Sequence, residues 1–170
     1  MFNRKKLTLF ITVAFIYCCA FAQQTAVKPC IKVSGEVTHP LQLCAEELQK
    51  MKHITVSSKD RGGAEHQYSG VPIADIFKLA GVSMGRELRG ENLAKYLLVT
   101  SADNYQVVFS LAELDSAFTD RVVILADAMD GKPLEAGVGP YRMIVPGEKR
   151  PARNSFQVVA LTVLFAKEKE

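Results

Sequence analysis

The feature that most constrains the fold is a succession of short β-rich runs, each bounded by turn residues and none followed by a long helix. In residues 31–37 apolar and polar side chains alternate, which indicates a strand with one buried face. Comparable apolar or β-branched runs occur at 41–43, 54–57, 96–100, 106–110, 122–126, 143–145 and 157–165. Because strands and helices do not alternate regularly, the sequence predicts an α+β fold with a mixed, mostly antiparallel sheet and short helices.

The predicted helices are short and scattered, at 45–51, 72–81 and 111–115. The clearest one begins at Pro72, whose missing N–H is no loss in a first helical turn, and ends at Gly81. Ser110 is the expected N-cap of the last helix. The polar residues 59–66 include a Gly-Gly pair and predict a loop.

The first 22 residues have the three-part order of a secretory signal peptide. Residues 4–6 are basic, residues 7–22 form an uncharged apolar run, and the run ends in the small-x-small triplet Ala20-Phe21-Ala22. The sequence therefore predicts cleavage after residue 22, one mature domain over residues 23–170, and export to the periplasm or secretion.

Two alternatives to cleavage stay open, an uncleaved membrane anchor and a lipid anchor on Cys18 or Cys19. The apolar run is shorter than the roughly 20 residues that a spanning helix needs. Tyr17 is bulky where a small residue should precede a lipidated cysteine. After cleavage no stable membrane span is expected.

Removal of the signal segment changes the charge balance of the chain. The full chain has 21 basic and 18 acidic residues, and three of the basic ones lie in residues 4–6, so 18 of each remain. A domain of near-zero net charge has no global attraction to nucleic acid or to an anionic membrane. No nucleic-acid partner is therefore expected.

Two of the four cysteines, Cys30 and Cys44, remain in the mature domain, on either side of the predicted turn at 38–40. An extracytoplasmic compartment permits a disulfide between them. The alternative is a pair of partly buried thiols, and the sequence alone does not decide between the two.

The most basic segment of the mature domain runs from Gly139 to Arg153. It places Arg142 at the start of a strand and carries Lys149, Arg150 and Arg153 on a loop shaped by glycine and proline. Fixed cations beside exposed backbone N–H groups can bind phosphate, and the planar guanidinium group matches its geometry. The alternative is a solvated basic loop.

The loop predicted at 59–66 is the second candidate site, because Arg61 adjoins the Gly-Gly pair and can approach an anion. Other motifs are missing from the sequence. The three histidines lack metal-ligand spacing, and the chain has no Gly-x-Ser-x-Gly, Walker or dinucleotide-binding pattern.

Three stretches together resemble the sulfite-oxidase-type oxidoreductase molybdopterin-binding domain family. Residues 68–81 resemble its aromatic-x-Gly-Val-Pro-Leu-x-Asp-Leu-Leu helix, and residues 99–111 resemble its Ala-Asp-Gly-Tyr turn with the following strand. Residues 130–147 resemble its Asp-Gly-x-Pro-Leu, Gly-Pro-x-Arg and Val-Pro-Gly motifs. The resemblance extends over residues 31–165 and implies a mixed α+β fold around a molybdopterin-type cofactor.

The resemblance also implies roles for individual residues. Basic residues hold the pterin phosphate in that family, and Arg142, Lys149, Arg150 and Arg153 match those positions. Arg61 joins this cofactor-binding set and also faces the expected substrate side.

Tyr105 is the candidate catalytic residue on the expected substrate side. Family enzymes carry a molybdenum-ligating cysteine just after the strand that precedes the aromatic-x-Gly-Val-Pro motif. Residues 54–61 contain no cysteine here, and Ser58 or a neighbour occupies that place in the cofactor site. A hydroxyl is a poorer ligand than a thiolate for a soft metal site, so the sequence predicts no protein metal ligand and leaves molybdenum binding open.

Three functions follow from these observations. The first is an exported molybdopterin-dependent oxidoreductase that passes electrons to a separate redox protein. The second is a non-catalytic relative that keeps the basic pocket and binds an anionic ligand or a protein partner. The third is an interaction domain without a ligand.

Overall fold

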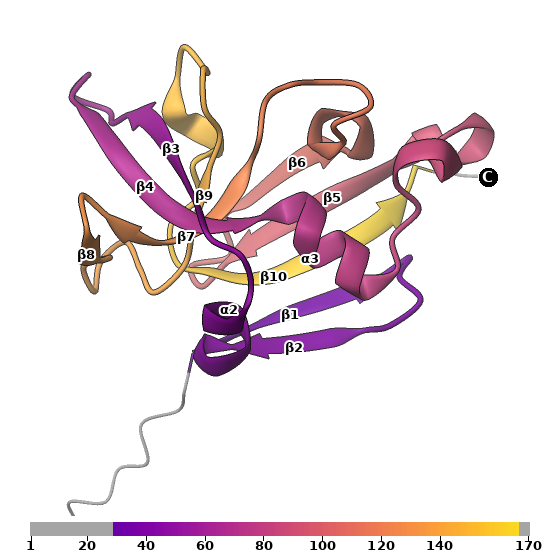
Figure 1. The fold of residues 1–170 in the computed structure, drawn as a ribbon, viewed down its shortest axis with the longest axis horizontal. Helices are drawn as coiled ribbons and strands as arrows, with labels where there is room; N and C mark the ends of the chain where they lie inside the picture. The colour runs from indigo at the N-terminus through magenta and orange to yellow at the C-terminus, as the bar shows by residue number, and fades with distance from the viewer. Residues whose placement is uncertain (1–28, 167–170) are drawn as a thin grey trace, which may run out of the picture.

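The computed structural model describes residues 29–166, which form two five-stranded sheets with a few short helices. The first sheet has the strand order β2-β1-β10-β5-β6, with β1 and β10 parallel and the other pairs antiparallel (Figure 1). Its strands are β1 (Cys30–Gly35), β2 (Leu41–Cys44), β5 (Lys95–Ser101), β6 (Gln106–Ser110) and β10 (Val158–Phe165). The predicted α+β class with a mixed, mostly antiparallel arrangement is confirmed, with the strands divided between two sheets.

The second sheet is antiparallel throughout and has the order β3-β4-β7-β8, with β9 also paired to β7. Its strands are β3 (Ile54–Lys59), β4 (Glu65–Pro72), β7 (Ile124–Met129), β8 (Lys132–Pro133) and β9 (Arg142–Ile144). The β3–β4 hairpin and the loop after β9 both project from this sheet (Figure 1), and they border the candidate site.

The helices connect the strands. They are α2 (Ala45–Lys50), α3 (Ile73–Ala80) and the 3₁₀ turns η1 (Gly85–Glu87), η2 (Gly90–Ala94), η3 (Leu111–Leu114) and η4 (Pro151–Arg153). The helix predicted at 72–81 is present as α3 but begins one residue later, because Pro72 is still the last residue of β4, and Gly81 ends it with a φ of 70°. At this φ glycine has no steric penalty, and its N–H bonds the carbonyls of the last helical turn.

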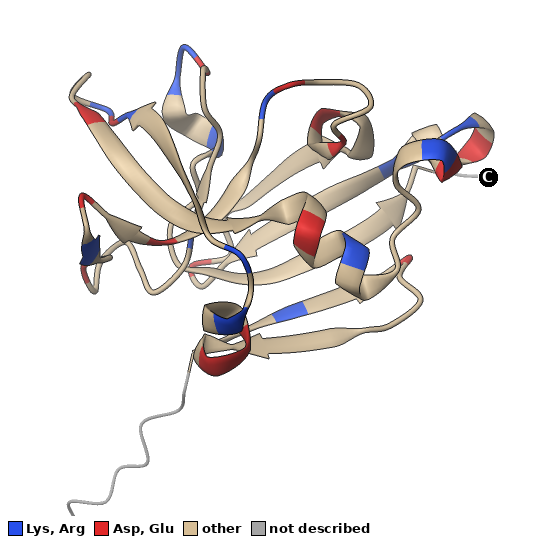
Figure 2. Cartoon of the chain, in the orientation of Figure 1, with Lys and Arg blue, Asp and Glu red and all other residues tan. Residues whose placement is uncertain are grey.

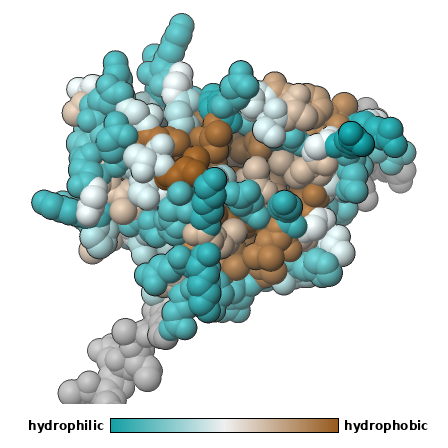
Figure 3. All heavy atoms as spheres, viewed as in Figure 1, coloured by the Kyte–Doolittle hydropathy of each residue, from teal (hydrophilic) through white to brown (hydrophobic). Residues whose placement is uncertain are grey.

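The main hydrophobic core joins α3, the first sheet and the inner residues of strands β4, β7 and β9 of the second sheet. Ile76 and Phe77 of α3 are completely buried, as are Leu97 and Phe109 of the neighbouring strands. A smaller cluster around Tyr68 packs within the second sheet. On the surface, polar side chains surround smaller apolar patches on the face shown in Figure 3. Burial of this apolar area is the main force that fixes the sheets and so positions the loops between them.

The prediction of a loop over 59–66 is wrong at both ends. Lys59 still belongs to β3 and Glu65 already belongs to β4, so the connection spans only 60–64. The polar composition of this stretch did not indicate a strand. Strand β4 is extended because its main chain is hydrogen-bonded to both β3 and β7. Strand β7 also begins two residues after the predicted start at 122.

The two cysteines of the described chain, Cys30 and Cys44, form a disulfide. They face each other in the β1–β2 register, where the hairpin brings their Cα atoms to 4.0 Å. The structure thus selects the bridge from the two possibilities that the sequence left open.

Among the described residues, no helix is long and apolar enough to cross a membrane. The predicted signal peptide at 1–22 lies outside the described residues.

Candidate functional site

A cleft with two adjoining hollows lies between the β3–β4 hairpin, the β5–β6 turn and the loop after β9. The two hollows share Arg61, Arg150 and Pro151. We call the first the Tyr105 hollow, of about 390 Å³, whose other lining residues are Ser101, Asp103, Tyr105, Ala152, Asn154, Ser155 and Phe156. We call the second the Lys149 hollow, of about 620 Å³, whose other lining residues are Ser57, Ser58, Lys59, Asp60, Gly63, Glu65, Gly147, Glu148 and Lys149.

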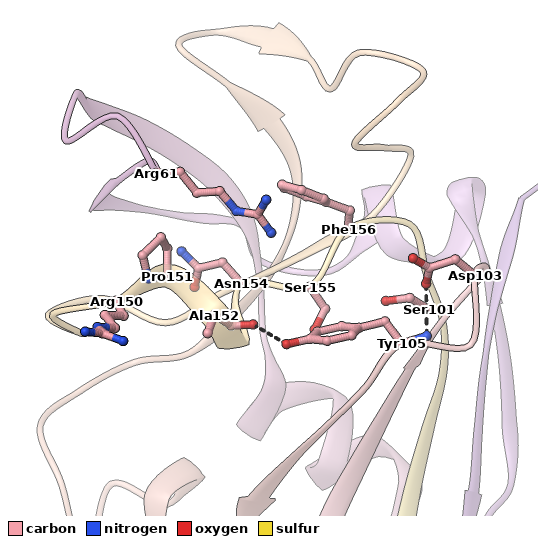
Figure 4. A pocket seen from close by; sticks show the side chains of 10 residues that line it. All are labelled: Arg61, Ser101, Asp103, Tyr105, Arg150, Pro151, Ala152, Asn154, Ser155 and Phe156. Atoms are coloured by element: carbon pink, nitrogen blue, oxygen red, sulfur yellow. Dashed lines mark hydrogen bonds between the residues drawn. The ribbon is translucent and has the colours of Figure 1, made fainter.

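The Tyr105 hollow is built on the tight turn between β5 and β6 (Figure 4). Asp103 accepts a hydrogen bond from the Tyr105 N–H at 2.9 Å, which fixes the turn, and the Tyr105 hydroxyl donates to the Ala152 carbonyl at 3.0 Å. The hydroxyl oxygens of Ser101 and Ser155 are buried without a hydrogen-bond partner among the described residues. This hollow therefore combines polar groups with aromatic surface.

In the Lys149 hollow the cations remain available while the acids are engaged. Asp60 accepts from the Ala64 N–H, Glu65 accepts from the Ser57 hydroxyl, and Glu148 pairs with an arginine. Lys149 and Arg150 are exposed and form no ion pair within residues 29–166. In Figure 2 the basic residues of the hairpin and of the loop after β9 lie on the same side of the molecule. These cations can bind an anion without first breaking an ion pair.

Ser58 is a buried part of this hollow, 8 % exposed, on the β3 strand. The amide of Asn154 donates to its hydroxyl at 3.3 Å, while the other end of Asn154 accepts from the Val145 N–H at 2.8 Å. The hydrogen bond between Asn154 and Ser58 therefore connects the loop after β9 to the β3–β4 hairpin.

Arg142 lies behind the cleft and is not among its lining residues. Its guanidinium is stacked on Phe156, with 4.4 Å between the carbon and the ring centroid, and it donates to the Tyr68 hydroxyl at 3.0 Å. Arg142 is 6 % exposed, and burial lowers its pKa from the ordinary arginine value. Its Nε has no partner among the described residues, and the buried positive charge is stabilised by two aromatic faces, the Tyr68 hydroxyl and the nearby Asp60 carboxylate.

Arg153 forms ion pairs with Glu113, at 2.9 Å, and with Glu148, and its guanidinium stacks on Phe109 at 4.4 Å. Burial would raise the pKa of Glu113, but hydrogen bonds from Arg153 and the Ser110 N–H hold it below its ordinary value. The structure therefore brings Arg61, Lys149, Arg150, Ser58 and Tyr105 to the cleft, and places Arg142 and Arg153 behind its wall.

His66 belongs to the polar stretch at 59–66, where the sequence suggests it, with Glu65, as a candidate acid–base residue, and the structure places it beside the site. It lies opposite Ser58 in the β3–β4 register, 2.7 Å from Asp130 and 3.6 Å from Asp60. Its hydrogen bond to Asp130 raises its pKa above the ordinary histidine value, and both carboxyl groups have lowered pKa values. The histidine links the hairpin that carries Arg61 to the β7–β8 turn.

Sequence reasoning missed Phe156, Asn154 and Asp103 as parts of the site. Phe156 lies three residues after Arg153, and an aromatic residue close to a cation cluster was the available signal. Asn154 gave no such signal, because its role depends on contacts with Ser58, 96 residues away.

The comparisons with known proteins agree with this architecture. The oxidoreductase molybdopterin-binding domain family matches residues 23–150. The sulfane dehydrogenase SoxCD from Paracoccus pantotrophus has a similar fold, with a TM-score of 0.63 and 20 % identity. The similarity covers 80 % of this chain but only 38 % of that one. No match was found among curated proteins.

The chain spans well under half of the SoxCD chain, so that structure establishes the shared fold alone. The family match covers most of the present chain, and the sequence motifs at 68–81 and 130–147 lie within it. This protein therefore belongs to the oxidoreductase molybdopterin-binding domain family.

Proposed function

We propose that this protein is an exported domain that binds a molybdopterin-type cofactor, or a closely related phosphorylated ligand, in the two-hollow cleft. The observation that carries the proposal is the convergence of Arg61, Lys149 and Arg150 on one cleft from two separate loops. None of the three forms an ion pair within residues 29–166. Charge-assisted hydrogen bonds from such groups are the strong interactions by which proteins hold phosphate.

The residues fit the phosphate end of the cofactor but not its molybdenum. The only cysteines in residues 29–166 are bonded to each other on β1 and β2. The segment where the family cysteine is expected has Ser58 or a neighbour in its place, and the hydroxyl of Ser58 accepts a hydrogen bond from Asn154. No cluster of three or more metal-ligating side chains occurs in the described part of the chain. We therefore assign no redox step to this site.

A second candidate function is a molybdenum-dependent oxidoreductase with a separate redox partner. The exposed side chain of Tyr105 favours it, because Tyr105 lines the first hollow and is accessible to a substrate there. In this function Tyr105 would contact the substrate, and the bound cofactor would supply the redox chemistry.

Export is supported by two independent features. The disulfide between Cys30 and Cys44 is typical of an oxidising compartment such as the periplasm or the extracellular space. The charged and then apolar order of residues 4–22 is typical of a cleaved signal.

The deciding experiment is to purify the full-length protein from a molybdenum-replete host and measure pterin and molybdenum per chain. The proposed function predicts a bound pterin with molybdenum well below one atom per chain. Stoichiometric molybdenum supports the second candidate, and the absence of molybdenum, of pterin and of any other bound phosphorylated ligand contradicts both.

Two matched pairs of variants test whether the ligand binds in the cleft. The pair Lys149→Gln and Arg150→Gln is expected to remove most of the pterin. The pair Lys78→Gln and Arg86→Gln removes the same charge from exposed residues elsewhere and should leave the pterin content unchanged.

A further inference from the structure

The two hollows of the cleft differ in what they offer a ligand. Arg61 and Arg150 line both hollows, but the two lysines at 59 and 149 line only the Lys149 hollow, and the aromatic ring of Phe156 lines only the Tyr105 hollow. The carboxylates of the Lys149 hollow are engaged with other groups, whereas Asp103 of the Tyr105 hollow keeps one oxygen free among the described residues. One long ligand with two chemically different ends fits this division better than two copies of a simple anion.

Phe156 is a prepared stacking surface. The buried guanidinium of Arg142 lies 4.4 Å from its ring centroid and itself contacts the Tyr68 ring at 5.2 Å, so the ring is fixed from behind. Arg61 lies further away, at 5.9 Å, on the exposed hairpin tip. A planar ring stacked on Phe156 needs about 3.5 Å between the planes, and Arg61, on the exposed hairpin tip, is the neighbour that moves aside to admit one.

Asp103 determines which hydrogen-bonding groups a ring in the Tyr105 hollow must present. One of its carboxylate oxygens already accepts from the Tyr105 N–H, and the other has no hydrogen bond within the described chain. A carboxylate accepts hydrogen bonds only, so its counterpart on a ligand is an edge that carries N–H donors. The 2-amino-4-oxopyrimidine edge, shared by pterin and guanine, has two adjacent N–H donors.

We propose that the Tyr105 hollow is the ring compartment of the cleft, in which a 2-amino-4-oxopyrimidine ring stacks on Phe156 and donates to Asp103. The phosphate of the same ligand then lies in the Lys149 hollow. Arg61, which lines both hollows, contacts the ring and the phosphate together. This inference rests on the proposed function, which it extends by assigning an end of the ligand to each hollow.

The test compares three probes by calorimetric titration of the full mature protein: neopterin phosphate, guanosine monophosphate and ribose 5-phosphate. The ring compartment predicts that both ring-bearing probes bind about tenfold or more tighter than ribose 5-phosphate, the range typical of one stacked base. A preference for the first probe identifies a pterin as the natural ligand type, and a preference for the second identifies a guanine nucleotide; either order supports the compartment.

Two variants test which residues account for the tighter binding of the ring-bearing probes. Phe156→Leu is expected to weaken the ring-bearing probes about tenfold and leave ribose 5-phosphate unchanged. Asp103→Asn, at an exposed position, tests the same compartment if Phe156→Leu does not fold. The control Phe118→Leu changes a phenylalanine that is 52 % exposed and lines neither hollow, and it should behave as the parent protein.

The outcomes separate this inference from the proposed function. If none of the three probes binds, the proposed function itself is contradicted. If ribose 5-phosphate binds as tightly as the two ring-bearing probes, or if both Phe156→Leu and Asp103→Asn leave the difference intact, the ring compartment alone is overturned.

Discussion

At the scale of single residues, neighbouring cations of one loop have different surroundings. Lys149 and Arg150 are exposed to the cleft, while Arg153 is held between Glu113 and Glu148. The composition of the loop predicted its basic character. It could not predict the pairing of Arg153, because Glu113 lies 40 residues earlier in the chain.

The role of Arg153 can be tested through stability. Arg153→Met removes two ion pairs and the stacking on Phe109. Among the described residues, Arg121 is then the one ion-pair partner left to Glu113 and Glu148, at 3.6 and 3.9 Å. We expect a loss of about 1–2 kcal/mol in the free energy of unfolding, measured by urea denaturation. Arg86→Met, at an exposed position, is the control, and an equal loss in both variants would show that the network contributes nothing.

His66 predicts a pH dependence. Its pKa is raised in the folded protein, so its contribution to stability is complete below its unfolded pKa and disappears as the pH rises through the folded pKa. Asp60 and Asp130 have lowered pKa values and stay ionised over that window. His66→Gln should therefore lower the urea midpoint more at pH 5.5 than at pH 9.

The control for this pH profile is His39→Gln, at an exposed position in the β1–β2 turn. Its urea midpoint should follow that of the parent protein. A loss in His66→Gln that is the same at pH 5.5 and at pH 9 would contradict the charged contact with Asp130.

At the scale of elements, the sequence predicted the helices and strands whose first and last residues are of types that favour such ends. Helix α3 has a proline before it and a left-handed glycine after it, and both signals are local. Strand β4 has no such signal at its start, because Glu65 and His66 are extended through pairing with β3. The cleft depends on this hairpin, so its shape could not be predicted from the sequence.

The β1–β2 hairpin supplies the prediction at this scale. The disulfide closes a loop with a sequence separation of 14, so replacement of both cysteines by serine should cost about 3 kcal/mol of stability. Urea denaturation of the Cys30→Ser, Cys44→Ser protein measures the loss. Identical denaturation curves for this variant and the oxidised parent would contradict a formed bridge.

At the scale of the whole molecule, the family resemblance read from the sequence is confirmed by the match over residues 23–150. Export remains a prediction, and the mass of the mature protein tests it. Cleavage after Ala22 gives a chain that begins at Gln23, whereas an intact N-terminus in the secreted or periplasmic fraction would contradict the proposed processing.

The central claim is that unpaired cations in the cleft hold the phosphate of an organic ligand. The most direct measurement is the affinity for neopterin phosphate, by calorimetry at fixed salt, of the parent protein and the Lys149→Gln, Arg150→Gln variant. We predict saturable binding by the parent and at least a tenfold weaker affinity in the variant, since each cation supplies a charge-assisted hydrogen bond. An unchanged affinity in the variant would contradict the account.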